Sequence, residues 1–445
     1  MKKSLSIKER VFIGSLIFGL FFGAGNLIFP IQMGQEAGSN VLQANLGFLV
    51  TGIGLPFLGL LAFGLSGSED LYHLSSKVGK RYALFFTTAL YLVIGPIFAM
   101  PRLASTSFEI GLAPFISEEY QGLGLLVFSG LFFSLVWLFS RKPSRILDYI
   151  GKFLTPLFLL LLFFILLLSF ISPLGGIQGL EVQGNYMEHA FFQGFQDGYN
   201  TLDALAALAF GTVVIENIRR LGLKDSKEIA KETTKSGFFG ILLMGVIYTL
   251  LALLGTMSLG TLSLNKNGGV TLAQVAQHYL GTFGNVLLAA IVIIACLKTA
   301  IGLSTSFGST FSELYPSKSY RFFTIGCIIL AMGIANVGLN EIIQISLPVL
   351  MFIYPLAMTL IIMGLLNQWI GEKKLVFQWV TYLTMVAAFF DALNSLPVSF
   401  KETKLVSMAL SFSTHYIPFF AVGMGWVTIA ILGLIIGLLL DRRTK

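Results

Sequence analysis

Charged residues are scarce in this sequence. Of its 445 residues 29 are basic and 22 acidic, so only 11% are charged, whereas 55% are hydrophobic. A typical soluble domain is about one quarter charged. So few charges cannot cover the water-facing surface of a soluble protein of this length. The shortage excludes a water-soluble globular protein, a disordered chain and a nucleic-acid-binding module.

Cysteine, histidine and nucleotide-binding motifs are also sparse. The two cysteines, Cys296 and Cys327, both lie within apolar runs, so we expect free thiols and no disulfide. The four histidines are scattered without HExxH or any other metal-binding spacing, and the chain has no GxxxxGK[ST] motif. We therefore expect no enzymatic activity, no cofactor and no direct hydrolysis of ATP.

Long apolar runs take the place of the missing charges. Stretches of about 20 mostly apolar residues have the length that a helix needs to cross a bilayer core of roughly 30 Å. The sequence therefore predicts an all-α polytopic membrane protein with about 12 transmembrane helices, the first of which is retained because no small-residue cleavage site follows it. The predicted spans are 9–35, 41–65, 82–100, 121–140, 153–173, 188–217, 237–260, 280–312, 320–337, 342–368, 375–395 and 418–440.

The basic residues indicate the orientation of these spans. With the N-terminus in the cytoplasm, 24 of the 29 Lys and Arg residues fall in cytoplasmic segments, four fall on the other side and Lys298 lies inside a span. Cytoplasmic loops of membrane proteins carry such an excess. The pattern predicts an even number of spans with both termini in the cytoplasm. The most charged segment, 217–236, is expected to be a cytoplasmic connector that carries a short amphipathic helix.

The first predicted span contains a weak point. The segment Gly23–Asn26 lies about 20 Å along the helix from Arg10, near the middle of the bilayer. Glycine lowers helix propensity and lets a ligand approach the backbone, and Pro30 removes a further backbone hydrogen bond. Backbone groups freed in this way are tolerated in lipid only where they line an enclosed cavity or bind something. The alternative is a small-residue face for helix packing.

The sixth predicted span contains a second weak point. The stretch 195–204 is too polar to face lipid, and Asp203 lies near the centre of the span. An acid at that depth is expensive unless it faces a cavity or has a partner, so we interpret it as functional. A structural acid bonded to a neighbouring helix is the alternative. The segment Leu208–Gly211 is a second possible position for the break, and the sequence does not decide between the two.

Breaks in spans one and six indicate two five-helix repeats of inverted orientation, because span one begins in the cytoplasm and span six begins outside. Broken helices at matching positions mark the central site of secondary transporters. Helix N-termini at a break attract a carboxylate, whereas free carbonyls suit a cation or an ammonium. The apolar surroundings favour a small zwitterion with an apolar side chain. We expect one membrane domain over 1–445, with repeat one at about 9–173, repeat two at about 188–368 and extra helices at about 375–440.

Lys298 is the only basic residue well inside a predicted span, too deep for its amine to reach the membrane surface easily. Its ammonium can occupy the place of a coupling cation, and Thr299 adds a hydroxyl of the kind found in hard-cation sites. A structural pairing and a misplaced span are the alternatives. Arg102 and Glu109 are expected at the outer vestibule or its gate, or else in a solvated loop.

Five segments, in order along nearly the whole chain, resemble the bacterial branched-chain amino acid carriers, the leucine-isoleucine-valine:cation symporter family. The resemblance implies uptake of leucine, isoleucine and valine with Na⁺ or H⁺ on the five-plus-five inverted-repeat fold of amino-acid transporters. The segments that carry it are Phe22–Pro30, Gly95–Arg102, Gly198–Asp203, Ala295–Leu303 and Gln344–Pro355.

In that wider fold one cation site lies between the broken first helix and span eight. The resemblance places it at the backbone carbonyls of Gly19, Phe22 and Ala295 and at the side chains of Lys298 and Thr299, although lysine replaces the usual small hydroxyl residue at 298. The residues expected to hold the substrate are Gly23, Ala24, Gly25, Asn26, Tyr199, Thr201 and Asp203.

The sequence thus predicts a secondary transporter in the bacterial cytoplasmic membrane that takes up branched-chain amino acids by alternating access. Its partners are the amino acid, the bilayer and Na⁺ or H⁺ as the coupling ion. Alternatives are a carrier of another small apolar amino acid, a membrane enzyme, a channel or an amino-acid sensor. An enzyme would need converging acid, base or metal-binding residues, and a channel would need repeated filter residues. The sequence shows neither.

Overall fold

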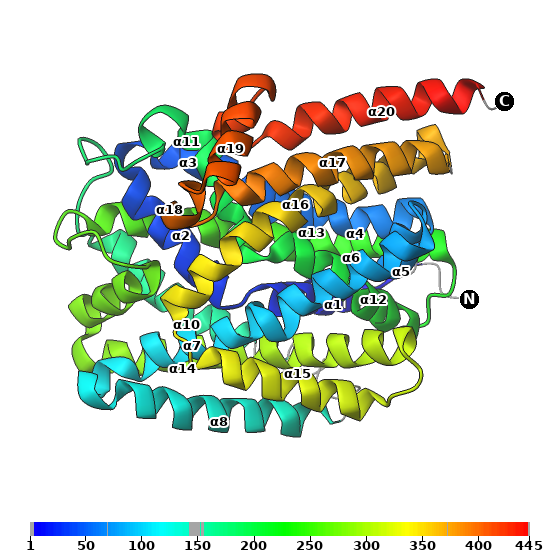
Figure 1. Cartoon of the computed structure of the whole chain (residues 1–445). Helices are drawn as coiled ribbons and strands as arrows, with labels where there is room; N and C mark the ends of the chain where they lie inside the picture. Colours follow the sequence, from blue (N-terminus) through cyan, green and yellow to red (C-terminus); the bar gives the residue numbers. More distant parts are fainter. Residues whose placement is uncertain (1–3, 69, 142–151, 153–154, 372, 444–445) are drawn as a thin grey trace.

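The computed structural model describes residues 4–68, 70–141, 152, 155–371 and 373–443, and within them it contains helices and connecting segments but no β-strand. Most helices run along one direction and form a bundle (Figure 1). Helix α1 (Ile7–Phe21) begins, and α20 (Gly425–Arg443) ends, at the same end of this bundle. Both termini therefore leave the bundle from one face.

The first half of the chain contains two interrupted helices besides the broken first one. The π-helical turns η2 and η3 join α3 to α4 and α6 to α7. The elements after α1 are α2 (Ala24–Ala37), η1 (Gly38–Asn40), α3 (Val41–Leu49), η2 (Val50–Gly54), α4 (Leu55–Ser66), α5 (Leu71–Ser76), α6 (Lys80–Leu92), η3 (Val93–Ile97), α7 (Ala99–Gly111), η4 (Ala113–Phe115), η5 (Glu118–Tyr120), α8 (Gln121–Ser140) and α10 (Thr155–Ile171).

The second half holds the longest helices. The elements before α20 are α11 (Tyr186–Asp197), η7 (Gly198–Thr201), α12 (Asp203–Arg220), α13 (Ser226–Ser258), α14 (Gly268–Leu314), α15 (Tyr320–Ala335), α16 (Leu339–Ile370), α17 (Lys374–Asn394), α18 (Val398–Lys401), α19 (Lys404–Tyr416) and η8 (Phe420–Val422).

Eight helical stretches of the described residues are long and apolar enough to cross a membrane, and the bent pair Tyr186–Thr201 and Asp203–Arg220 makes a ninth. Two shorter apolar helices, α10 and α15, accompany them. The chain is an all-helical multi-pass membrane protein. The count of twelve crossings and the inverted repeat remain predictions, and the first two residues of the expected span 153–173 lie outside the described residues.

Several segments differ from the predicted spans. Helix α14 begins at Gly268, 12 residues before the predicted start, with a kink at Gly281, and α20 begins at Gly425, seven residues after the predicted start. The basic segment 217–236 does not hold a separate amphipathic helix, because α13 begins at Ser226 and continues into the apolar span. The carboxylate of Asp225 accepts a hydrogen bond from the backbone N–H of Glu228 and so caps the start of α13. The helix expected at 82–100 instead bends at Gly95, and α7 continues to Gly111.

Glycines bring α2 and α13 into backbone contact. A Cβ atom at Gly34 would lie 2.0 Å from the carbonyl oxygen of Ala252, and one at Gly255 would lie 2.2 Å from the carbonyl oxygen of Ile31. Neither position has room for a side chain. In addition, the hydroxyl of Thr256 donates to the carbonyl of Gly34 at 2.7 Å. This contact fixes α2, which begins at the first break, against an uninterrupted helix.

Candidate functional site

The first break lies between α1 and α2. Phe22 and Gly23 have extended backbone conformations there, and α2 restarts at Ala24. The side-chain oxygen of Asn26 accepts a hydrogen bond from the backbone N–H of Gly23 at 2.7 Å. The end of α1 therefore presents backbone carbonyls, and the start of α2 presents N–H groups, within the predicted segment Gly23–Asn26.

The second break lies at 198–202. The turn η7 leads to Leu202, which has a positive φ of 65°, and α12 restarts at Asp203 with a bend of 40°. A Cβ atom at Gly198 would lie 1.9 Å from the hydroxyl oxygen of Thr51, so this turn packs closely against η2. The alternative position, Leu208–Gly211, lies within α12.

A buried hydrogen-bonded cluster joins the two breaks. The side-chain amide of Asn26 donates to both carboxylate oxygens of Asp203, at 2.8 and 3.0 Å. The hydroxyl of Tyr248, from α13, also bonds to the Asp203 carboxylate and to the Asn26 amide. Asp203 is fully buried and is the first residue of α12, where the helix dipole favours a negative charge. The acid that the sequence marked as functional thus connects three helices.

A small cavity of about 30 Å³ lies between the breaks, room for about two water molecules. Five of the seven predicted substrate residues line it, namely Gly23, Ala24, Gly25, Asn26 and Thr201. We call it the central cavity. Its other lining residues are Leu20, Phe21, Ile94, Ala99, Arg102, Leu103, Leu202, Ala206, Phe210, Thr299 and Leu303.

Tyr199 and Asp203, the other two predicted substrate residues, do not line the central cavity. The ring of Tyr199 stacks on that of Tyr354, with centroids 4.3 Å apart, and so holds η7 against α16. Asp203 lies behind Asn26. Asp203 thus contacts a lining residue, whereas Tyr199 supports the turn that carries Thr201.

Three oxygens of the predicted cation site come together between α1 and α14. The hydroxyl of Thr299 lies 3.2 Å from the carbonyl oxygen of Phe22 and 3.1 Å from that of Ala295. Gly19 is buried in α1, one turn before the break. The oxygens of these three neighbours are the ligand type that Na⁺ and other hard cations prefer.

The Lys298 amine makes no hydrogen bond to these oxygens. Its amine lies over the aromatic rings of Phe158 and Phe18, 4.6 and 5.4 Å from the ring centroids. The residue is fully buried, and its amine has no hydrogen-bond partner in the described part of the chain. Cation–π attraction therefore takes the place of a carboxylate partner. No acid of the described residues pairs with Lys298, and its structural contacts are the two aromatic rings.

Two larger cavities lie at opposite ends of the bundle. The one at the end where the chain starts and finishes has about 500 Å³ and contains Asp70, Tyr91, Glu216 and Glu313. The one at the other end has about 480 Å³ and is lined by residues that include Phe29, Asn200 and Lys266. We call them the inner and the outer cavity. The central cavity lies between them. Its volume of about 30 Å³ is too small to hold a leucine.

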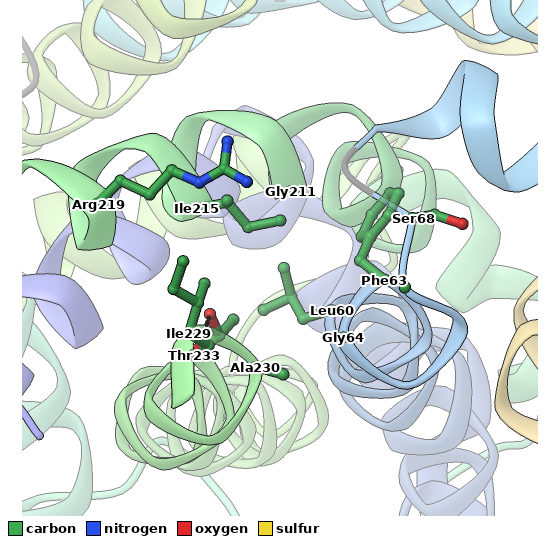
Figure 2. A pocket seen from close by; sticks show the side chains of 11 residues that line it. Leu60, Phe63, Gly64, Ser68, Gly211, Ile215, Arg219, Ile229, Ala230 and Thr233 are labelled. Carbon is green, nitrogen blue, oxygen red and sulfur yellow. Dashed lines mark hydrogen bonds between the residues drawn. The ribbon is translucent and has the colours of Figure 1, made fainter. Parts of the chain in front are cut away.

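A further cavity of about 40 Å³ lies between α4, α12 and α13 (Figure 2). Leu60, Phe63 and Ile215 point into it, and the guanidinium of Arg219 lies at its edge (Figure 2). It is mainly apolar and lies away from both breaks. It therefore lacks the free backbone groups that a zwitterion requires.

Sequence reasoning missed Tyr248 and the place of Arg102 in the wall of the central cavity. Tyr248 is a single tyrosine in an apolar span, and no spacing marks it as a partner of Asp203. Arg102 was expected at the outer vestibule or its gate, and it lines the central cavity itself. No three His, Cys, Asp or Glu side chains of the described residues gather as a metal site.

Comparison with known sequences gives consistent matches. The model of a family described as "Branched-chain amino acid transport protein" matches residues 6–444. The chain is 43% identical to "Branched-chain amino acid permease BrnQ" of Lactobacillus delbrueckii subsp. lactis over 96% of this chain and 95% of that one. It is 39% identical to the permease of the same name from Bacillus subtilis, over the full length of both.

Comparison with solved structures extends the likeness to the fold. The nucleobase-cation-symport-1 family transporter Mhp1, in a closed conformation, superposes with a TM-score of 0.59 and 13% identity over 98% of this chain and 93% of that one. MhsT, solved in complex with L-phenylalanine, gives a TM-score of 0.56 and 15% identity over 99% of both chains. The chain has the fold of these transporters.

Proposed function

Because the chain belongs to the family of branched-chain amino acid transport proteins, whose permeases are not enzymes, we propose that it takes up leucine, isoleucine and valine by cation-coupled alternating access. The proposed location is the bacterial cytoplasmic membrane, with both termini in the cytoplasm. The observation that carries the proposal is a cavity bounded by two helix breaks, with larger cavities toward both ends of the bundle.

The substrate's charged groups would bind to the backbone at the breaks. The N-terminus of α2 offers N–H groups and a positive dipole end to the carboxylate, while the carbonyls that end α1 suit the ammonium. Leu20, Ile94 and Phe210 give the remaining wall an apolar character that matches a branched aliphatic side chain. Asn26 and Thr201 supply polar side chains from the two breaks.

Asp203 and Tyr199 would act as positioning residues. Asp203 occupies the N-terminus of α12 and holds the Asn26 amide, while the Asn26 oxygen binds the Gly23 N–H, so the next N–H groups in the first turn of α2 would be left for the substrate. Tyr199 holds η7 through its stacking on Tyr354. Five of the predicted substrate residues would then contact the substrate, and Asp203 and Tyr199 would hold the two breaks in place around it.

The coupling cation would bind where the Thr299 hydroxyl meets the Phe22 and Ala295 carbonyls, with Gly19 completing the site. Lys298 lies beside this site in its own aromatic surroundings. Two roles in coupling are open to Lys298. Its amine could carry the coupled proton, or its ammonium could take the place of Na⁺. Each role predicts a different dependence of leucine uptake on the Na⁺ and H⁺ gradients in variants that lack the amine.

The test is uptake of labelled leucine by the purified protein in liposomes, under imposed Na⁺ or H⁺ gradients. We expect saturable uptake that one of the gradients stimulates and that unlabelled isoleucine and valine inhibit. Lys298→Ala and Lys298→Thr are expected to change which gradient is effective. Absence of stimulation by either gradient would disprove symport, and unchanged ion dependence in both variants would remove Lys298 from the coupling mechanism.

A further inference from the structure

Arg102 separates the central cavity from the outer cavity. Its side chain extends from α7 and is only 3% exposed. The Nη2 atom donates to the backbone carbonyl of Asn200 at 2.7 Å, and the guanidinium carbon lies 5.0 Å from the ring centroid of Phe29. Arg102 lines the central cavity, whereas Phe29 and Asn200 line the outer one. The three groups together form the partition.

The partition joins the two broken helices. Phe29 belongs to α2 and Asn200 to η7, so the guanidinium bridges the half-helices on the side of the outer cavity. Gly25 leaves the space for it, because a Cβ atom there would lie 3.2 Å from both the Arg102 Nη2 atom and the Asn200 carbonyl oxygen. The guanidinium is therefore packed against the first turn of α2.

The other terminal nitrogen of Arg102, Nη1, is buried and has no hydrogen-bond partner in the described part of the chain. Arginine stays charged in proteins, and a buried charge in a membrane protein is expensive without an anionic partner. Asp203 attracts the guanidinium from a distance but makes no hydrogen bond or ion pair with it, and its carboxylate is bonded to Asn26 and Tyr248. The Nη1 atom of Arg102 is thus a strong hydrogen-bond donor without an acceptor among the described residues.

We propose that Arg102 binds the carboxylate of the transported amino acid and that the same guanidinium, held by Phe29 and Asn200, is the outer gate. A guanidinium and the N-terminus of α2 then face one anion from two sides. Opening the route to the outer cavity requires that Arg102 leave the Asn200 carbonyl, and an arriving carboxylate stabilises the closed arrangement. This proposal rests on the proposed function, since it assumes an amino acid in the central cavity.

The first experiment compares two ligands that differ only in the carboxylate. Binding of L-leucine and of L-leucinamide is measured by calorimetry on the purified full chain and on Arg102→Met, Arg102→Lys and the surface control Arg321→Met. We expect Arg102→Met to weaken leucine binding at least 30-fold and leucinamide binding less than threefold. Arg102→Lys should lie between the wild type and Arg102→Met, and Arg321→Met should bind both ligands as the wild type does.

Equal loss of both ligands in an Arg102→Met protein that keeps its melting temperature would overturn the carboxylate role. So would unchanged binding of leucine. Failure of the wild-type protein to bind leucine at all is a different result, because it contradicts the proposed function itself.

The second experiment tests the gate without a transport measurement. Ala206→Cys places a thiol at the central cavity, in a background that carries Cys296→Ala and Cys327→Ala. A membrane-impermeant thiol reagent is added from the side of the outer cavity. We expect Arg102→Ala to raise the labelling rate at least tenfold, and leucine to slow labelling only when Arg102 is present. An equal rate with and without Arg102 would rule out its role as the gate.

Discussion

The side-chain amide of Asn26 lies 2.8 Å from Oδ1 of Asp203, so the two half-helices that begin at the breaks are tied together directly. Each residue stands in the first turn of its half-helix. Any movement that separates α2 from α12 must break this bond. The pair is expected to keep the two half-helices together while the surrounding helices move.

The first prediction concerns this tie. Asp203→Asn removes the charged acceptor for the Asn26 amide and the Tyr248 hydroxyl, and we expect initial leucine uptake to fall roughly tenfold or more, as for loss of a hydrogen bond to a charged group. Tyr248→Phe removes one of these bonds and should have a smaller effect. Asp225→Asn is the matched control, because asparagine can still cap α13. Equal uptake by Asp203→Asn and Asp225→Asn would contradict the prediction.

The second prediction concerns the oxygens around Thr299. Thr299→Ala removes a hydroxyl that lies within 3.2 Å of two carbonyl oxygens. We expect the concentration of coupling cation that gives half-maximal uptake to rise about tenfold. Thr299→Ser keeps the hydroxyl and should stay within about threefold of the wild type. The measurement is leucine uptake as a function of cation concentration, and similar values for both variants would show that the hydroxyl is not a ligand.

The third prediction concerns the inner end of the central cavity. The hydroxyls of Tyr91 and Ser306, which line the inner cavity, both donate to the carbonyl of Ala209 on α12, at 2.9 and 3.2 Å. Tyr91→Phe removes one donor. We expect a thiol at Ala206→Cys to be labelled from the side of the inner cavity about two- to tenfold faster, the range that one neutral hydrogen bond supplies.

Tyr315→Phe is the control for that measurement, since it removes a tyrosine hydroxyl that contacts the hydroxyl of Thr88 and does not touch α12. Labelling should stay at the wild-type rate. If Tyr315→Phe accelerates labelling as much as Tyr91→Phe does, the bond to Ala209 is not part of the inner closure.

The fourth prediction concerns the contact between α2 and α13. Gly34→Ala places a methyl group 2.0 Å from the carbonyl oxygen of Ala252, so the helices must move apart, and we expect a loss of about 1–3 kcal/mol in stability. Gly130→Ala is the matched control. No atom lies within 4 Å of its Cβ, and alanine favours the helix by up to about 1 kcal/mol. Thermal unfolding in detergent distinguishes the two, and equal melting temperatures would argue against backbone contact at Gly34.

Much of the site follows from local sequence. The segment Gly23–Asn26 combines low helix propensity with polarity in an apolar run, and the first break lies there. Helix α8 matches its predicted span, because a long apolar run with turn residues before it and basic residues after it leaves little choice. Such features depend on neighbours along the chain.

Other features depend on distant parts of the chain. The second break lies within the polar stretch 195–204, but the choice between that stretch and Leu208–Gly211 was not local, and the close contact of Gly198 with Thr51 is a distant feature that accompanies it. Lys298 was placed correctly within its helix, but its direction depends on Phe158, on α10. The end predicted for the third span was wrong because Pro101 lies in the first turn of α7, after the bend at Gly95, where proline replaces an N–H that has no helical partner.

Leu202 carries a consequence for how the second break behaves over a transport cycle. A leucine with φ of 65° is held in the left-handed region, which is about 1–2 kcal/mol less favourable than a right-handed conformation. A change of Leu202 to a right-handed conformation removes this unfavourable free energy. Taken alone, this residue contributes a factor of roughly ten in favour of any other arrangement of the bundle in which it adopts a right-handed conformation.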